Sequence, residues 1–502
     1  MNDKTPTQSI LKNIIHWLYC PLKPISRSSL KRKRYFIINL VIASLVVGGL
    51  AWMEDSIFFK EQKDRVLDWV MYWHSDFSVV LANQQEMQRM MLVEIDETTF
   101  REWGSPVITP RDKLKEIIAK AEQAGASVIA VDLELSWWSD GCIHEVGKTP
   151  ACSLADSTAD DSLAQYLHSL NERQTPKAPI IILTRTYRYP LGKTQAFRER
   201  APSFLDDTLK SQKNVFWSST FFKVDDDRIR RRWQLASLIC QDEHLTLMPS
   251  MQLLVAMTQL YTTPDSTREA AQLIRTKLKQ WNDWANTLSC DANQGSTLAQ
   301  LCQRQQSCPD LTVELPKQAG LSDETHLVDL AGGRETERVV YRFAPPDNPN
   351  PFQRRLIDKI NAQQLLSHDI DNQIVLIGVT YPESGDHHPI PIRDKEVDGV
   401  YIVANAIDTL LRFGQFQPQP WLNQWLISLA IIIIATIIFS LYGIIRAFAY
   451  STIIVGVALF VLSGQALHHG IGVDIALPLL AIQIVQMILY IFETLYEGGK
   501  SC

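Results

Sequence analysis

Apolar runs divide the chain into a long segment of mixed composition and several uninterrupted hydrophobic stretches. Within the mixed segment, an apolar run at 92–96 is followed by helically spaced apolar residues at 114–121 and a second apolar run at 127–135. Apolar residues three and four positions apart predict an amphipathic helix, and short β-rich runs predict strands. We therefore expect a βαβ unit here, with the two strands paired in parallel through a right-handed crossover.

Further elements of both kinds follow in the mixed segment. β-like runs lie at 179–187, 214–222, 339–343 and 372–379, helical runs lie at 249–260, 263–286 and 400–411, and residues 290–320 resemble a loop. Strands that alternate with helices predict α/β layers around a largely parallel sheet. The expected fold is a three-layer α/β domain.

Four apolar stretches lie outside this predicted domain, at residues 35–53, 424–443, 447–467 and 474–492. Each is about as long as a helix must be to cross the hydrocarbon core of a bilayer. A cleaved signal peptide is the alternative for the first stretch, but its long basic leader and the lack of a small-residue cleavage site favour an uncleaved anchor. The sequence thus predicts four transmembrane helices, one N-terminal and three C-terminal.

Charge is distributed unevenly between the ends and the middle of the chain. Residues 1–34 carry eight Lys or Arg and one Asp, whereas residues 35–420 carry 39 basic and 51 acidic residues. Basic residues collect on the cytoplasmic side of membrane spans, so the tail 1–34 and the stub 493–502 are expected in the cytoplasm and residues 54–420 outside it. An acidic domain argues against nucleic acid as a partner, because phosphate binding requires a basic surface.

Six of the eight cysteines lie in the segment expected outside the cytoplasm. They are Cys142, Cys152, Cys240, Cys290, Cys302 and Cys308. An even number of cysteines in an oxidising compartment predicts disulfide bonds. We expect a bond between Cys142 and Cys152 and at least one more among Cys290, Cys302 and Cys308. Zinc binding is the alternative, but no C-x-x-C spacing supports it.

Charged residues follow the ends of several predicted strands. The candidate ligand-binding residues are Asp96, Glu97, Arg111, Asp132, Glu134, Asp386 and His387. In open parallel sheets, ligands bind outside the carboxyl ends of the strands. Such side chains can bind a polar ligand or a cation, or perform acid–base chemistry. The alternative is that they cap helices, hold turns and pair with arginines, and the run Arg230, Arg231 and Arg232 is expected in a solvated turn.

The common catalytic and nucleotide-binding motifs are missing from the sequence. It contains no G-x-S-x-G, H-E-x-x-H, Walker A or Rossmann glycine pattern. We therefore expect no enzyme activity, no cofactor and no bound metal. The predicted spans contain glutamines but no charged residue that would indicate an ion path, which argues against a transporter.

Four motifs occur in a fixed order between the first apolar stretch and the last three. They are VEIDETTFREWG with PRDKLKEIIAKAEQAGASVIAVDLEL, then DDDRIRR, then MPSMQLLVAMTQLY, then DNQIVLIGV with VDGVYIVANAIDTLL. Together these motifs resemble the CHASE2 extracytoplasmic sensory domain of bacterial membrane proteins, over about residues 60–420. Residues 264–335 form an enlarged region, and SPVITP stands where relatives have a segment similar to Trp-Pro-Trp. Relatives often continue into a cytoplasmic output domain, for which the ten residues 493–502 leave no room.

The resemblance implies a multi-pass sensor of the bacterial inner membrane. Its periplasmic domain would detect a ligand or a partner protein and signal through the spans to a separate membrane or cytoplasmic effector, in a homo-oligomer or a hetero-complex. A non-catalytic structural subunit of a membrane complex is the alternative. A periplasmic hydrolase that uses Asp96, Asp132 and His387 is the least favoured hypothesis.

Overall fold

The structure is a computed structural model that describes most of the chain between residues 56 and 472. The described residues are 56–77, 90–136, 157–172, 178–190, 197–210, 212–262, 267–304, 308–316, 325–333, 336–341, 357–361, 373–391, 396–418, 421–442, 444–468 and 470–472, with single positions within 37–49 and 483–491. They divide into two compact units. The larger comprises Asp68–Pro418 with Leu467–Gly472, and the smaller comprises Met1–Leu67, Gln419–Ala466 and Val473–Cys502.

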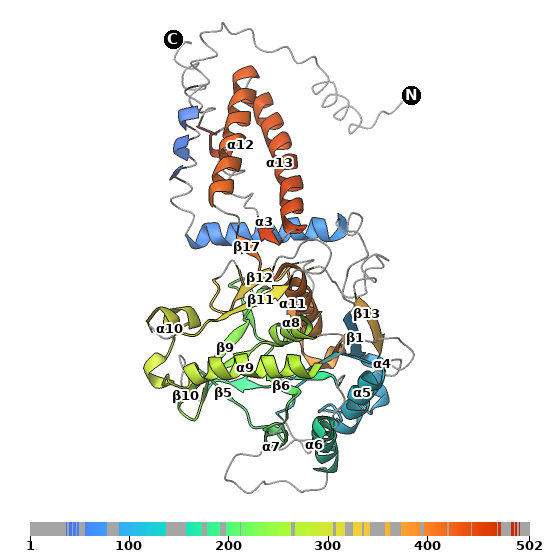
Figure 1. Ribbon diagram of the computed structural model, residues 1–502. Helices are drawn as coiled ribbons and strands as arrows, with labels where there is room; N and C mark the ends of the chain where they lie inside the picture. Colours follow the sequence, from blue (N-terminus) through green and yellow to red (C-terminus); the bar gives the residue numbers. More distant parts are fainter. Residues whose placement is uncertain are drawn as a thin grey trace, which may run out of the picture. The chain divides into compact units, whose positions relative to one another are not determined.

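The larger unit is built on a six-stranded sheet in which all neighbouring strands are parallel. The strands are, in spatial order, β13 (Ile357–Asn361), β1 (Met90–Ile95), β14 (Ile374–Val379), β2 (Val128–Asp132), β3 (Ile180–Thr184) and β6 (Val215–Ser218) (Figure 1). The predicted α/β fold with a largely parallel sheet is confirmed. The predicted pairing of the first two strands with each other is wrong, because β14 lies between β1 and β2 and pairs with both.

Helices cover the two faces of this sheet. One face packs against α5 (Arg111–Gln123) and α6 (Ser157–Glu172), and the other packs against α8 (Met251–Tyr261) and α11 (Gly399–Phe413). Because side chains alternate along a strand, the even-numbered residues of the inner strands face α8 and α11 and the odd-numbered ones face α5 and α6. Both faces are apolar, as is usual for a parallel sheet between helices.

The helices form where the apolar spacing predicts them. In α5 the buried apolar residues are Leu114, Ile117, Ile118 and Ala121, which recur at helical spacing. The chain leaves α5 through Gly125, which has a φ of 88° that favours glycine. In α8 the N-cap is Ser250, whose hydroxyl accepts a hydrogen bond from the Leu253 amide at 3.3 Å.

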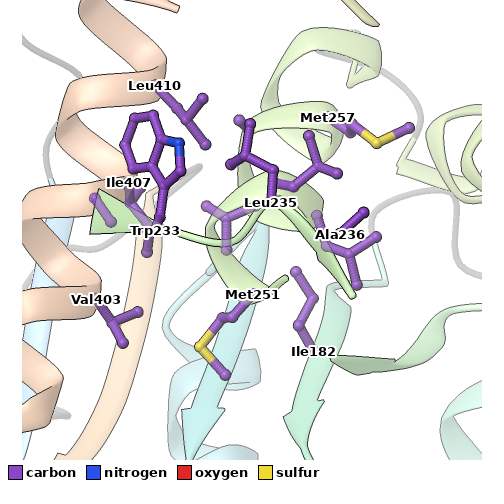
Figure 2. Packing of buried hydrophobic residues seen from close by; sticks show 14 of the residues in the cluster. Ile182, Trp233, Leu235, Ala236, Met251, Met257, Val403, Ile407 and Leu410 are labelled. Carbon is purple, nitrogen blue, oxygen red and sulfur yellow. The ribbon is translucent and has the colours of Figure 1, made fainter. Parts of the chain in front are cut away.

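A single buried cluster joins α8 and α11 to the sheet. Trp233, at the end of β8 (Arg230–Trp233), is fully buried in this cluster. Figure 2 shows Trp233 near Ile407 and Leu410 of α11, in the same cluster as Ile182 of β3. Strand β8, which pairs with β7 (Phe222–Val224), therefore contributes its last side chain to the core of the domain.

A smaller four-stranded sheet contains a hairpin that the sequence pattern did not indicate. Its strands are, in order, β10 (His244–Pro249), β9 (Ala236–Gln241), β5 (Arg198–Arg200) and β4 (Tyr187–Arg188). The turn between β9 and β10 consists of Asp242 and Glu243, with φ values of 50° and 67°. Hairpin turns with positive φ usually contain Asn or Gly, so this turn lacks the ordinary sequence signal.

The enlarged region contains more regular structure than predicted. The helix α9 (Thr267–Ala285) confirms the helical run at 263–286. The loop expected at 290–320 is wrong in part, because α10 (Leu298–Arg304) and β11 (Thr312–Pro316) lie within it. β11 pairs with β12 (Thr325–Asp329). In the strand predicted at 339–343, the described residues 339–341 are buried but do not form a strand.

Two disulfide bonds lie in this part of the domain. Cys302 and Cys308 are bonded at 2.02 Å, which confirms the bond expected among the last three cysteines. Cys240, for which the sequence suggested no partner, is bonded to Cys290 at 2.07 Å. Cys142 and Cys152 lie outside the described residues.

The smaller unit contains α12 (Trp421–Leu441) and most of α13 (Ile444–His468). The ring of Tyr442, directly after α12, lies 5.3 Å from the ring of Tyr450 in α13. Within α13, Ala449–Leu467 is long and apolar enough to cross a membrane, and among the described helices it is the one that meets this test. A shorter apolar stretch, Leu426–Ile438, lies in α12. The spans expected at 35–53 and 474–492 lie mostly outside the described residues.

Candidate functional site

Near the carboxyl ends of the central strands, the face toward α8 and α11 carries a row of polar side chains interrupted by a glycine. Glu94 of β1 lies beside Gly378 of β14, and Gly378 lies beside Asp132 of β2. Thr184 of β3 follows, and it pairs in register with Ser218 of β6. All five residues have even numbers, so they continue the apolar face that packs on α8 and α11. That face therefore ends in a polar row at the carboxyl edge of the sheet, which we call the polar row.

α11 covers the part of the polar row on β1 and β14. A Cβ atom at Gly378 would lie 2.4 Å from Cγ2 of Val400, so glycine allows the first turn of α11 to approach β14. Next to Val400, the Tyr401 hydroxyl donates a hydrogen bond to the buried carboxylate of Glu94. The close approach of the helix thus gives Glu94 a partner away from water.

Asp132 is the most perturbed acid of the polar row. Its Oδ1 accepts a hydrogen bond from the Thr184 hydroxyl at 3.3 Å, and its carboxylate also accepts one from Thr220. Burial and the nearby carboxylate of Asp386 raise the pKa of Asp132 to about 7. Both effects disfavour the charged form, since burial removes water and a like charge repels. Asp132 therefore changes its protonation near neutral pH.

Asp386 lies in the connection after β14, against the first residue of α11. Its carbonyl oxygen accepts a hydrogen bond from the Gly399 amide at 2.9 Å. A Cβ atom at Gly399 would lie 2.3 Å from Oδ2 of Asp386, so only glycine leaves room for the carboxylate there. This places the negative charge at the N-terminus of a 15-residue helix, where the helix dipole stabilises an anion.

A histidine connects Asp386 to an arginine. Nε2 of His388, in β15 (His387–Pro389), lies 2.8 Å from Oδ1 of Asp386, and its Nδ1 lies 3.1 Å from Nη2 of Arg230. Because a guanidinium only donates hydrogen bonds, Nδ1 accepts from Arg230 and Nε2 donates to Asp386. The chain Asp386–His388–Arg230 thus fixes the orientation of the imidazole.

Three of the predicted site residues serve local structure. Asp96 is the N-cap of α4 (Glu97–Glu102), and its Oδ1 accepts from the Thr99 amide at 2.8 Å. Oε1 of Glu97 lies 2.6 Å from Nε of Arg101 on the same helix. Oε1 of Glu134 accepts from the Ser136 amide at 2.9 Å. These contacts are the caps and turns that the sequence left open as the alternative to ligand binding.

Two more predicted site residues have protein partners. Arg111 is buried, with Nε 3.7 Å from Oδ1 of Asp160 and Nη2 3.2 Å from the carbonyl oxygen of Glu134. Burial lowers the pKa of Arg111 to about 10. Nδ1 of His387 lies 2.9 Å from Oδ1 of Asp398, the N-cap residue of α11. Of the predicted site residues, Arg111 thus contacts Glu134, and Asp132 lies near enough to Asp386 for their charges to interact.

The expectation of a solvated arginine turn at 230–232 is wrong, because Arg231 and Arg232 are buried in β8. Arg231 contacts Asp227 through two hydrogen bonds of 2.7 Å, and its Nε donates to Asp68 at 2.8 Å. Asp68 belongs to α3 (Ile57–Phe77). We call the ion-paired residues Asp68, Asp225, Asp227, Arg231, Arg232 and Arg338 the Asp68 network.

Sequence reasoning missed several residues at the carboxyl edge. They are Thr184, Thr220, Ser218, Glu94 and Gln252. Arg230 is among the arginines that the sequence offered as partners of the acids and histidines at this edge, and its contact with His388 agrees with that alternative. Some of them carried a signal: Glu94 and Thr184 are polar positions at the ends of apolar runs, and Gln252 interrupts the apolar sequence of α8. The contacts of His388 and Arg230 join segments distant in sequence, which a local pattern does not reveal.

The start of α8 lies at the same edge of the sheet. The Met251 amide donates to the Ser219 carbonyl oxygen at 2.9 Å, and the Ser219 amide donates to the Pro249 carbonyl oxygen at 3.0 Å. Ser219 directly follows the last residue of β6, so the first turn of α8 lies beside the polar row. Two helices, α8 and α11, thus begin at the carboxyl edge of the sheet.

This arrangement has the chemistry of a polar binding site. It combines carboxylates, hydroxyls, an imidazole and a guanidinium at the carboxyl ends of parallel strands, where α/β proteins bind their ligands. In the described part of the chain, no group of three or more His, Cys, Asp or Glu residues is placed to hold a metal ion.

Comparison with known proteins gives one match. The model of the CHASE2 domain, an extracellular sensory domain, matches residues 41–445. No curated protein and no solved structure matches the chain. Because the matched residues make up most of the sequence and include the whole central sheet, this chain belongs to the CHASE2 domain family.

Proposed function

We propose that this protein is a membrane-anchored sensor that detects a ligand at the carboxyl edge of its CHASE2 sheet. The observation that carries the proposal is the set of polar side chains at this edge, where Asp132 of the polar row bonds to Thr184 and Asp386 bonds to His388 against the start of α11. The charge of Asp386 contributes to the raised pKa of Asp132. Domains of this family sense extracellular signals, and a site with repelling acids gains stability when a ligand neutralises them. We propose no catalytic activity for it.

The proposed location is the bacterial inner membrane, with the sensory domain in the periplasm. One N-terminal span at 35–53 and three C-terminal spans at 424–443, 447–467 and 474–492 would hold the protein there. The apolar helix Ala449–Leu467 and the eight basic residues of the tail 1–34 support this topology. The bonds Cys240–Cys290 and Cys302–Cys308 support an oxidising compartment for the domain.

The proposed signal leaves the domain through the two helices that connect it to the spans. α3 follows the first predicted span in sequence, and its Asp68 is fixed to β8 by the Asp68 network. α11 precedes the second predicted span in sequence, and its first residue, Gly399, lies against Asp386. A ligand that moves Asp386 therefore acts on the start of α11. Such a ligand shifts the balance between two states only by binding one of them more tightly.

The test is the recovery of a separate effector from native membranes. The tagged full-length protein and its Asp386→Asn variant are cross-linked in the cells that produce them, purified and analysed by mass spectrometry. We expect a membrane or cytoplasmic partner whose yield differs between the two proteins. Recovery of no partner would contradict the proposal. A partner retained at fixed stoichiometry with both proteins would favour the structural-subunit alternative.

A further inference from the structure

A short segment at the end of α13 belongs to the larger unit. Leu467–Gly472 group with Asp68–Pro418, whereas the preceding Gln419–Ala466 belong to the smaller unit. The family match ends at residue 445, so this segment lies beyond the matched residues. In the sequence it connects the predicted spans at 447–467 and 474–492. The chain therefore returns to the domain after it has left it, and we call Leu467–Gly472 the link.

The link pairs with the chain just after α11. β18 (Ile471–Gly472) lies parallel to β17 (Gln417–Pro418), with Ile471 opposite Gln417. The Gln417 amide donates a hydrogen bond to the Gly470 carbonyl oxygen at 2.9 Å. An isolated pair of short strands has little stability of its own, so this pair depends on the packing around it.

Two glycines allow the link to lie directly against aromatic side chains. A Cβ atom at Gly470, whose φ is 69°, would lie 2.6 Å from Cβ of Phe413. A Cβ atom at Gly472 would lie 2.5 Å from Cε1 of Phe416, a side chain that is 1% exposed. A larger residue at either position would push the link away from the end of α11. The sequence thus has glycine at two positions where this contact requires it.

The same end of α11 is fixed to the rest of the domain. The buried Gln415 side chain accepts a hydrogen bond from the Asp329 amide at 2.8 Å and donates one to the Asp329 carbonyl oxygen at 2.6 Å. A Cβ atom at Gly414, whose φ is 64°, would lie 2.6 Å from Cβ of His326. Asp329 and His326 both belong to β12. The end of α11 therefore contacts β12 as well as the link.

α11 connects the link with the candidate site. Its first residue, Gly399, lies against the carboxylate of Asp386, and every residue from Gly399 to Leu410 is buried. A helix of 15 residues is about 22 Å long, and a packed helix carries a displacement from one end to the other. A shift at Asp386 therefore reaches Phe413 and the link that packs on it.

We propose that the link couples the domain to the last two predicted spans. This inference rests on the proposed sensory function and specifies how the signal leaves the domain. Through the chain itself, α11 leads to the predicted span at 424–443. The link adds the outer ends of the predicted spans at 447–467 and 474–492. Movement of one helix thus displaces three spans together, and the two states of the sensor differ in the positions of all three.

The first experiment tests whether the link is docked in the full-length protein in native membranes. Gln417→Cys and Ile471→Cys are introduced together, because opposite residues of neighbouring strands lie about 4.8 Å apart, within the range of a disulfide bond. After mild oxidation, mass spectrometry measures the peptides joined through these positions. We expect at least tenfold more joined peptide than from Gln417→Cys with Val107→Cys, since Val107 is 100% exposed but is not a strand neighbour of Gln417.

A glycine substitution should release the link. Gly470→Ala places a Cβ atom against Phe413 and should lower the yield of joined peptide at least fivefold. Gly295→Ala is the matched control, because Gly295 has a φ of 71° and no described atom lies within 4 Å of its added Cβ. The two substitutions impose similar backbone strain, and Gly470→Ala adds the collision. The control should leave the yield unchanged.

The second experiment tests whether the link carries the signal. The difference in partner recovery between the wild type and Asp386→Asn is measured again with Gly470→Ala or Gly295→Ala also present. We expect the difference to shrink at least threefold with Gly470→Ala and to persist with Gly295→Ala. A difference of the same size in both backgrounds would overturn the role of the link.

The proposal is also overturned if the strand-neighbour pair yields no more joined peptide than the Val107→Cys control pair. That result together with an Asp386-dependent partner would reject the link and keep the sensor. A docked link in a protein from which no partner is recovered would reject the effector and keep the attachment of the last two predicted spans to the domain.

Discussion

Charged side chains gather at two places in this domain that differ in burial and in charge balance, since Arg231 of the Asp68 network is 3% exposed and Asp386 is 38% exposed. The Asp68 network contains three arginines and three aspartates, and Arg231 contacts all three aspartates. The polar row instead brings Asp132 close to Asp386, with Arg230 held one residue away by His388. Paired charges of opposite sign stabilise the fold. Like charges repel each other, and a ligand that neutralises them stabilises the protein on binding.

The pKa values follow this difference. In the Asp68 network, the hydrogen bonds from Arg231 lower the pKa of Asp227. In the polar row, burial and the charge of Asp386 raise the pKa of Asp132 to about 7. Perturbed acids that lack a neutralising partner concentrate at functional sites, and paired acids concentrate in structural networks.

The largest expected effect is the loss of the Asp68 network. Replacement of Arg231 by Met leaves three aspartates without their shared cation in a buried place. We expect a loss of about 3–5 kcal/mol in the free energy of unfolding, measured with denaturant. Arg101→Met is the control, because Arg101 pairs with Glu97 on the surface, and its loss should cost less than about 1 kcal/mol. Similar losses in the two variants would show that the network is not structural.

Removal of the charge of Asp132 should raise the free energy of unfolding, whereas replacement of Arg231 lowers it. The folded pKa of about 7 lies above the ordinary value of 3.8, so the folded wild type binds a proton more tightly than the unfolded chain does. The wild type therefore loses stability as pH rises from about 4 to 7. Asp132→Asn should be more stable than the wild type at pH 8, by on the order of 2 kcal/mol, and similar to it near pH 4. A stability difference that does not change between these pH values would contradict the assignment.

A smaller gain in the free energy of unfolding is expected when the amide of Gln252 is removed. Gln252 is 0% exposed, and its amide has no hydrogen-bond partner among the described residues. Gln252→Met keeps the length of the side chain and eliminates two buried polar atoms, so we expect about 1–2 kcal/mol of added stability. Gln259→Met is the matched control on the same helix face, because it removes a formed hydrogen bond to Ser127. This control should lose about 1 kcal/mol. A loss of stability in Gln252→Met would show that its amide is satisfied.

The smallest effect is expected at the start of α4. Glu97→Gln removes an exposed charge that pairs with Arg101 at the same edge of the sheet. The unfolding free energy should change by less than about 0.5 kcal/mol, measured with denaturant. A loss above about 1 kcal/mol would show that this exposed pair contributes to the fold.

The sequence predicted the elements whose signal is local. Apolar spacing indicated α5, α8, α9 and α11, and a compact apolar run indicated β14. It did not indicate that β14 separates β1 from β2, because strand order depends on contacts between distant segments. It also missed the β9–β10 hairpin, whose turn contains Asp242 and Glu243 in place of Asn or Gly.

The sequence indicated that acids follow the strands of the sheet, but it did not indicate which of two neighbouring residues contacts them. Asp132 and Asp386 meet at the carboxyl edge, as the parallel sheet suggested. The sequence selected His387, yet its neighbour His388 contacts Asp386, because consecutive side chains of β15 point to opposite sides. Whether the selected residues bind a ligand stays a prediction.

β14 lies between β1 and β2 in the sheet but comes long after both in the chain, so the sheet cannot be completed until β14 has been synthesised. The Ser127 hydroxyl at the start of β2 bonds to the carbonyl of Gln373, 246 residues away. While the chain is being synthesised, β1 and β2 are available long before their common neighbour, and each presents an open strand edge. Such edges pair readily with other chains, so we expect the nascent domain to be most prone to aggregation before residue 379 has emerged.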